Sequence, residues 1–116
     1  MQWLSFLTAV TLVLRGVDAK AVFAHFMVSN SVNYTSSDWE DDIHLAQEAH
    51  IDAFAMNFAY DQGDEPQIAT AFSVAESKGF KLLFSFDYAG NGPWPQDLVI
   101  GYINQYKSSS AYFNYQ

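Results

Sequence analysis

The sequence predicts an α/β protein that contains the first three βα units of a (β/α)8 TIM barrel, incomplete in this chain. Apolar runs typical of buried strands alternate three times with helical patterns, an order that calls for a parallel sheet covered by helices. Each run ends near one polar residue, namely His25, Asn57 or Asp87, and these residues lie 32 and then 30 residues apart. That interval is about the length of one βα unit.

The amino-acid composition limits the classes of molecule that the protein could bind. Half of the 116 residues are hydrophobic and 17% are aromatic, so the chain is not disordered. Five basic and 13 acidic residues give a formal net charge of -8, which argues against nucleic acid and against an anionic membrane surface. A neutral polymer such as a polysaccharide remains open. The chain has no cysteine, so it has neither a disulfide framework nor a thiolate metal site, and its compartment stays undetermined.

The first 19 residues differ from the rest of the chain. Leu4–Leu14 is an apolar run that is too short to span a bilayer, which takes about 20 residues. It resembles the core of a signal peptide, and Val17-Asp18-Ala19 suits a cleavage site, although Arg15 follows the run and no basic residue precedes it. The alternative is a buried first element of the domain. We expect residues 1–19 to be a signal peptide, and residues 20–116 to be secreted and free of the membrane.

The first strand is predicted at Ala21–Val28, where only His25 interrupts the apolar residues. Such a run is typical of a strand buried on both faces. The polar loop after this strand contains Asn33-Tyr34-Thr35, an acceptor triplet for N-glycosylation at Asn33. The triplet agrees with secretion, although so short a pattern often arises by chance.

A helix is predicted from about Asp38 to His50. Ser37 and Glu40 form a possible capping box, and the acidic residues of the first turn suit the helix dipole. The helix presents one apolar face, made of Trp39, Ile43, Ala46 and His50. The acidic cluster could suggest a metal site, but capping already explains it, so we expect no metal and no cofactor.

The later elements repeat the same alternation. They are a strand at 52–59, a helix from about Pro66 to Gly79 with Asp64 and Gln67 as a possible capping box, a strand at 80–86 and a helix at 96–107. After three serines, Ala111–Gln116 begins an aromatic segment where a fourth strand is due. Because a complete barrel takes about 250 residues, we expect the chain to be the N-terminal portion of a larger domain.

Alternation along the strands assigns their faces. One face carries mostly small side chains and the polar residues, namely Ala53, Ala55, Asn57, Leu83, Ser85 and Asp87. The opposite face carries large ones, namely Phe54, Met56, Phe58, Leu82, Phe84 and Phe86, which should meet the helices. We therefore expect His25, Asn57 and Asp87 side by side at the carboxyl ends of the strands, where barrels bind ligands. An open doubly wound sheet would bind there too, but no Gly-x-Gly-x-x-Gly follows a strand.

The stretch with the most candidate ligand-binding side chains is Phe80–Pro95. In it a strand ends at Asp87, and the loop that follows contains Asn91, Trp94, two glycines and two prolines. A carboxylate, an amide and an indole together suggest a site for a polyhydroxylated ligand. The alternative is that Asp87 caps the next helix and Trp94 covers the core.

The residues also resemble a known family over essentially all of 20–116. The segments that carry the likeness are 20–28, 38–43, 49–55, 103–106 and above all Gly79–Pro95, with its specific Phe-Ser-Phe-Asp-Tyr-Ala-Gly-Asn-Gly-Pro-Trp-Pro. They resemble the fungal α-1,3-glucanases, the mutanases of glycoside hydrolase family 71. The resemblance implies a secreted (β/α) barrel enzyme that hydrolyses the α-1,3-glucan of fungal cell walls with inversion.

The resemblance also implies roles for single residues. An inverting glycosidase needs a general acid and a general base, which would lie on a later strand, beyond Gln116. Asp87 would then bind sugar hydroxyls or hold the partner of the acid, Trp94 and Tyr88 would stack on sugar faces, and His25 and Asn57 would complete the subsite wall. Two alternatives remain: His25 as a satisfied core histidine, and Asn57 as an amide that caps backbone groups.

Such a chain would be inactive alone, because half of the barrel and the catalytic pair are missing. Two other hypotheses are a non-catalytic protein that binds α-glucan in the cell wall, and a truncated gene product without a stable fold.

Overall fold

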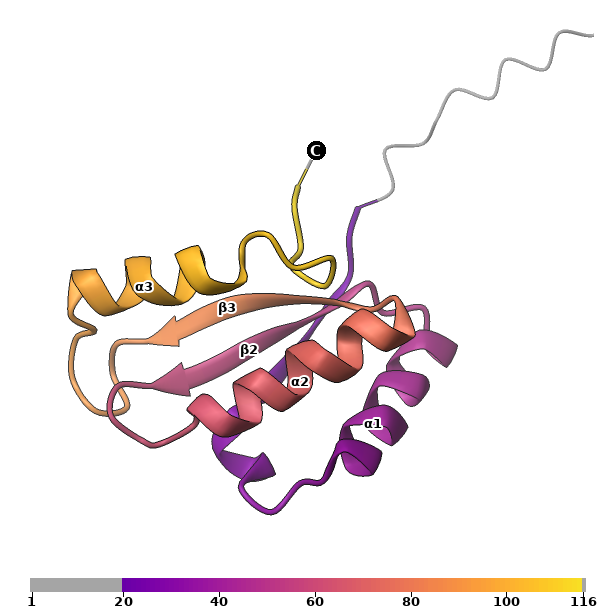
Figure 1. The fold of residues 1–116 in the computed structure, drawn as a ribbon, viewed down its shortest axis with the longest axis horizontal. Helices are drawn as coiled ribbons and strands as arrows, with labels where there is room; N and C mark the ends of the chain where they lie inside the picture. The colour runs from indigo at the N-terminus through magenta and orange to yellow at the C-terminus, as the bar shows by residue number, and fades with distance from the viewer. Residues whose placement is uncertain (1–19, 116) are drawn as a thin grey trace, which may run out of the picture.

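The computed structural model describes residues 20–115 and shows a parallel sheet of three strands in the order β1-β2-β3, with α1 and α2 side by side (Figure 1). The elements are β1 (Phe23–Met27), the 3-10 turn η1 (Val28–Ser31), α1 (Ser36–Glu48), β2 (Ala53–Ala59), α2 (Glu65–Lys78), β3 (Lys81–Asp87) and α3 (Gln96–Tyr106). The predicted order of elements is confirmed. The predicted signal peptide at 1–19 lies outside the described residues.

The core lies between the sheet and the helices. Phe54, Met56 and Phe58 of β2 are buried, as is Leu82 of β3, and they join one cluster with Trp39, Ile43, Ile68 and Phe72 of the helices. Phe84 and Phe86 pack against the same cluster. The prediction that the large side chains of the strands face the helices is therefore confirmed.

β1 is not buried on both faces, so that prediction is wrong. Ala24 and Phe26 pack against the core, but Phe23, His25 and Met27 on the opposite face are exposed. β1 is also an edge strand, since it pairs only with β2 within residues 20–115. The apolar run reflects an inner sheet face that the described helices do not cover.

A fourth strand position begins beside β3. The Leu82 N–H donates to the Ala111 carbonyl at 2.7 Å, and the Phe113 N–H donates to the Leu82 carbonyl at 2.8 Å, in a parallel bridge. The ring of Phe113 also lies 4.9 Å from that of Phe23 on β1, at the other edge of the sheet. The segment after α3 thus contacts both β3 and β1.

α1 begins two residues earlier than predicted. Its N-cap is Thr35, whose Oγ1 accepts from the Asp38 N–H at 3.4 Å, while the Thr35 N–H donates to Asp38 Oδ2 at 2.7 Å. The bond from the Thr35 N–H, together with one that the Thr35 hydroxyl donates to Asp38 Oδ2, lowers the pKa of Asp38. The predicted box of Ser37 and Glu40 is wrong because both residues already lie inside the helix. His50 follows the helix in a left-handed turn with φ 59° and is exposed, so it does not belong to the apolar face.

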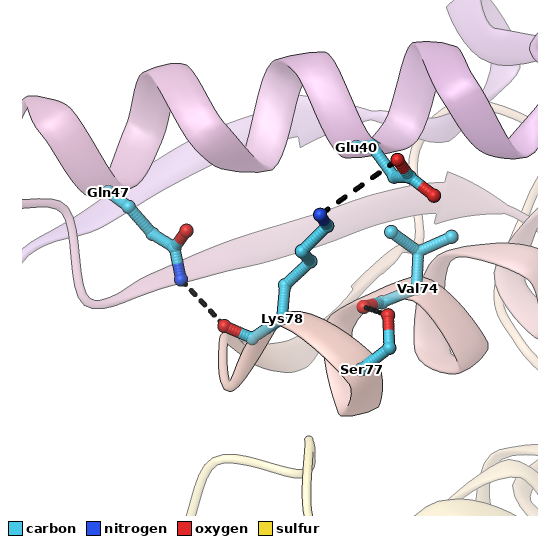
Figure 2. Close-up of polar contacts among 5 residues, drawn as sticks. All are labelled: Glu40, Gln47, Val74, Ser77 and Lys78. Carbon is cyan, nitrogen blue, oxygen red and sulfur yellow. Dashed lines mark hydrogen bonds and ion pairs between the residues drawn. The ribbon is translucent and has the colours of Figure 1, made fainter.

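Polar contacts join α1 to the end of α2, as Figure 2 shows. Gln47 Nε2 donates to the Lys78 carbonyl at 2.9 Å, and Lys78 Nζ lies 3.9 Å from Glu40 Oε2. The Ser77 hydroxyl donates to the Val74 carbonyl at 2.8 Å. α2 then ends at Gly79, whose φ of 66° suits glycine. Gln47 thus satisfies a carbonyl that the helix end leaves free.

The predicted capping box at α2 is also wrong. Asp64 makes no capping bond, and Gln67 turns to the other helix instead. Gln67 Oε1 accepts from the Trp39 indole at 2.8 Å, and Gln67 Nε2 donates to the Tyr34 carbonyl at 3.1 Å. Asp64 Oδ2 is left buried without a hydrogen-bond partner within residues 20–115.

Asp64 should make stability depend on pH. Burial, and then the charge of Glu65, raise its pKa above 3.8. In the window just above pH 3.8 the Asp64 carboxyl therefore holds its proton more tightly in the folded state than in the unfolded state, so its contribution to the free energy of unfolding falls as pH rises. The Asp64→Asn variant should lose this fall, which a series of melting temperatures from pH 3.5 upward would reveal. The exposed Asp41→Asn should keep it. Parallel curves for the wild type and Asp64→Asn would contradict the assignment.

Within residues 20–115, no helix combines the length and the apolarity needed to cross a bilayer.

Candidate functional site

The three predicted rim residues share the inner face of the sheet but lie at different levels. His25 pairs with Ala55, Asn57 pairs with Met27 and Ser85, and Asp87 pairs with Ala59. Each is therefore displaced by two residues along the sheet from the one before it. The three form a diagonal row across the strands rather than the side-by-side set that the spacing predicted. The diagonal arrangement follows from the register in which the parallel strands pair.

Asn57 and His25 differ in their surroundings. The half-buried Asn57 donates through Nδ2 to the Ser85 carbonyl and to Ser85 Oγ, both at 3.3 Å. Its amide therefore caps a backbone group of β3, which was one of its predicted roles, and its carbonyl oxygen keeps capacity to accept. His25 is exposed and makes no side-chain hydrogen bond or ion pair with residues 20–115. His25 is therefore not a core histidine whose hydrogen bonds are satisfied.

Asp87 holds the loop after its own strand. Its Oδ1 accepts from the Ala89 N–H at 2.8 Å and the Gly90 N–H at 3.0 Å. A Cβ on Gly90 would lie 2.7 Å from Asp87 Oδ2, so only glycine fits there without a shift. Asn91 Nδ2 donates to the Tyr60 carbonyl at 2.7 Å and ties the loop to the end of β2. Asp87 thus caps this loop and not helix α3.

Trp94 lies on the opposite side of the sheet from this row. It is 7% exposed and belongs to the core cluster. Its ring centroid lies between 5.1 and 5.7 Å from those of Phe58, Tyr60, Phe86 and Tyr102. The structure thus gives Trp94 the core position that the sequence left as an alternative to sugar stacking. Tyr88, in contrast, is 54% exposed beside Asp87.

The inner face can bind hydroxyl groups. From the middle of β1 to the carboxyl end of β3 it offers an imidazole, an amide, the Ser85 hydroxyl and the Asp87 carboxylate, of which Oδ2 has no hydrogen bond to residues 20–115. No group of three His, Asp or Glu side chains in this part of the chain could hold a metal ion. Asp87 is the single carboxylate on the inner face of the three strands, whereas glycoside hydrolysis needs two. The row therefore has hydrogen-bonding groups but no acid–base pair.

Sequence reasoning named Ser85 and Asn91 but did not predict the contacts that they and Gly90 make. Ser85 holds the Asn57 amide, and Gly90 and Asn91 position the loop. Ser85 was detectable, because it alternates onto the same face as Asp87. The contact of Asn91 with Tyr60 joins residues 31 apart and has no local signal.

Comparison with known proteins assigns the family. The profile of Glycosyl hydrolase family 71 matches residues 18–116. A mutanase of Penicillium rubens is 39% identical over 98 residues, covering 84% of this chain and 22% of the relative. A glucan endo-1,3-alpha-glucosidase of Schizosaccharomyces pombe is 44% identical over 70 residues, covering 59% of this chain and 16% of the relative. An ascus wall endo-1,3-alpha-glucanase of the same yeast is 28% identical over 89 residues, covering 75% and 21%.

This chain spans about a fifth of the length of these relatives. The likeness nevertheless covers every strand and helix that the structure describes, together with the loop that Asp87 organises. On this ground the chain belongs to glycosyl hydrolase family 71.

Proposed function

We propose that the chain is the amino-terminal part of a (β/α)8 barrel in a secreted endo-1,3-α-glucanase, which hydrolyses the α-1,3-glucan of fungal cell walls with inversion. The observation that carries this is the family match over residues 18–116. The names of the relatives support the substrate. The parallel order β1-β2-β3, with a fourth position begun at Tyr112, supports the barrel.

Within this enzyme the diagonal row forms a sugar-binding wall. Asp87 Oδ2 and the Asn57 carbonyl oxygen accept from sugar hydroxyls, His25 adds a further polar group, and Tyr88 offers an exposed ring at the rim. The acid and the base, whose carboxyl groups stand roughly 6.5–9.5 Å apart in inverting enzymes, belong to strands beyond Gln116. Catalysis therefore needs more of the barrel than residues 20–116.

The 116-residue chain should release no reducing sugar from insoluble α-1,3-glucan, because its inner face carries one carboxylate. The measurement is a reducing-sugar assay, with a full-length mutanase as positive control and the heated chain as blank. Robust release of reducing sugar by the chain alone would refute the proposal that the catalytic acid and base lie outside residues 20–116.

A non-catalytic wall-binding protein is the second candidate, and the exposed diagonal row is the observation that favours it. Both candidates predict that the chain binds α-1,3-glucan. Asp87→Ala and Asn57→Ala should each weaken pull-down by about two- to tenfold, since one hydrogen bond contributes about 0.5–1.5 kcal/mol. Asp41→Ala, which removes a carboxylate on the exposed face of α1, should bind as the wild type does. Unchanged glucan binding in both rim variants would contradict the proposal that the diagonal row binds sugar.

We also propose that residues 1–19 are a signal peptide and that Asn33 carries a glycan. Asn33 is exposed in the loop before α1, where an oligosaccharide would meet no core. Expression in a secreting yeast should yield protein in the medium that begins at Lys20 and loses mass on endoglycosidase treatment. The Asn33→Gln variant should lack that mass shift. Retention of residues 1–19 in the secreted protein would contradict the cleavage.

A further inference from the structure

A cavity lies on the helix side of the sheet, away from the diagonal row. It is a groove of about 710 Å³ between α2 and α3, within the range of natural ligand sites. α2 contributes Glu65 and Ala69, and α3 contributes Leu98, Gly101, Tyr102 and Tyr106. We call it the α2–α3 groove.

Small residues keep this groove open. Ala69 lies on one wall, and Gly101 presents no side chain on the other; a Cβ there would meet no atom within 4 Å. α2 packs closely against α1 but makes few contacts with α3. At one end the two helices are bridged by Tyr106, whose ring stacks on Phe72 of α2 with centroids 4.2 Å apart.

The lining of the groove suits a neutral polyhydroxylated ligand. Three tyrosines, two acids and a glutamine line it, namely Tyr60, Tyr102, Tyr106, Asp61, Glu65 and Gln105, whereas no lysine, arginine or histidine does. An anionic ligand would therefore meet only negative charge. Hydroxyls, carboxylates and an amide pair with sugar hydroxyls, and half-buried aromatic rings cover apolar sugar faces.

Two aromatic residues of the lining also carry polar groups. Trp94, the buried residue of the lining, has an indole N–H without a hydrogen-bond partner among residues 20–115. Burial, together with the hydrogen bond to Glu65, raises the pKa of Tyr102, so its hydroxyl stays protonated. The buried indole N–H is not accessible from the groove, so hydrogen bonds to a ligand would come from the hydroxyls, carboxylates and amide of the lining.

The groove opens near the rim that carries Asp87. Tyr60 directly follows β2, and Glu65 and Leu98 lie in the first turns of their helices, so one end of the groove lies at the carboxyl ends of the strands. In a closed barrel α2 and α3 are neighbours in the outer ring. Later helices would then follow α3 around the ring and leave the groove facing outward.

We propose that the α2–α3 groove is a second glucan-binding site, outside the sugar-binding wall, which holds a neighbouring segment of the insoluble polymer. The proposal rests on the proposed function for the identity of the polymer. Binding at two places would keep the enzyme on an insoluble substrate while its inner face engages one chain.

The test fills the groove without disturbing the helix. In Gly101→Leu the new side chain enters the groove, whereas Gly101→Ala adds one methyl group and should stabilise α3 by about 0.5–1 kcal/mol. Asn104→Leu, which adds the same side chain at an exposed position of α3 outside the lining, is the matched control. Affinity of the full chain for insoluble α-1,3-glucan should fall at least fivefold in Gly101→Leu, fall less in Gly101→Ala, and stay unchanged in Asn104→Leu. Melting temperatures should show all three variants folded.

The outcomes separate this proposal from the proposed function. Unchanged affinity for α-1,3-glucan in Gly101→Leu, or an equal loss of affinity in Asn104→Leu, would show that the groove does not bind glucan. Loss only in the rim variants Asp87→Ala and Asn57→Ala would overturn it too and leave the wall standing. Loss in Gly101→Leu but not in the rim variants would keep the groove and remove the wall. If the wild-type chain bound neither α-1,3-glucan nor β-1,3-glucan, the proposal that the groove binds glucan would be wrong. The hydrolase proposal would stand, because it places catalysis on later strands.

Discussion

Replacing Trp94 with alanine should destabilise the fold by about 3–5 kcal/mol, as expected for a large aromatic side chain removed from a core. Trp94 is 7% exposed, and four aromatic rings from β2, β3, α3 and the loop after β2 surround it. Its loss would open a cavity where these elements meet. Chemical denaturation followed by circular dichroism would measure the change in the free energy of unfolding.

Two further variants make this result decisive. Trp94→Phe keeps a ring in the cavity and should cost clearly less than Trp94→Ala. Tyr88→Ala removes an exposed aromatic ring at the rim and should leave stability almost unchanged. If Trp94→Ala instead melted like the wild type and lost only glucan binding, Trp94 would be a sugar-stacking residue after all.

Gly90→Ala should cost about 1–3 kcal/mol, the usual effect of forcing atoms into a packed site. The added Cβ would lie 2.7 Å from Asp87 Oδ2 and 3.0 Å from the Cβ of Ala59. The loop would have to move, and the bonds from the Ala89 and Gly90 N–H groups to Asp87 would weaken. Glucan binding should weaken with them, because the same carboxylate belongs to the proposed sugar-binding wall.

A double-mutant cycle assigns this cost to its cause. In an Asp87→Ala background the carboxylate is absent, so Gly90→Ala should cost less than it does in the wild type. Gly101→Ala is the control, because its Cβ meets no atom within 4 Å. A cost for Gly90→Ala that is the same in both backgrounds would show that Asp87 is not the obstacle.

Predictions that rest on one strand or one helix end fared unequally. The alternation of large and small side chains correctly assigned the core face of β2 and β3, because side chains alternate by geometry alone. The predicted capping boxes at Ser37 and Asp64 were wrong. Several acidic and hydroxyl side chains stand near each helix start, and spacing alone does not say which backbone groups they reach. Thr35 with Asp38 fits the same spacing and is the pair that forms.

The sequence by itself determined the order of elements, the faces of the strands and the family, since each depends on residues close together in the chain or on a long continuous match. Only the tertiary structure decided the diagonal arrangement of His25, Asn57 and Asp87, because the register between strands depends on how the connecting helices pack. It likewise placed Trp94 in the core. Trp94 packs where segments from Phe58 to Tyr102 converge, and no local pattern states where such segments meet.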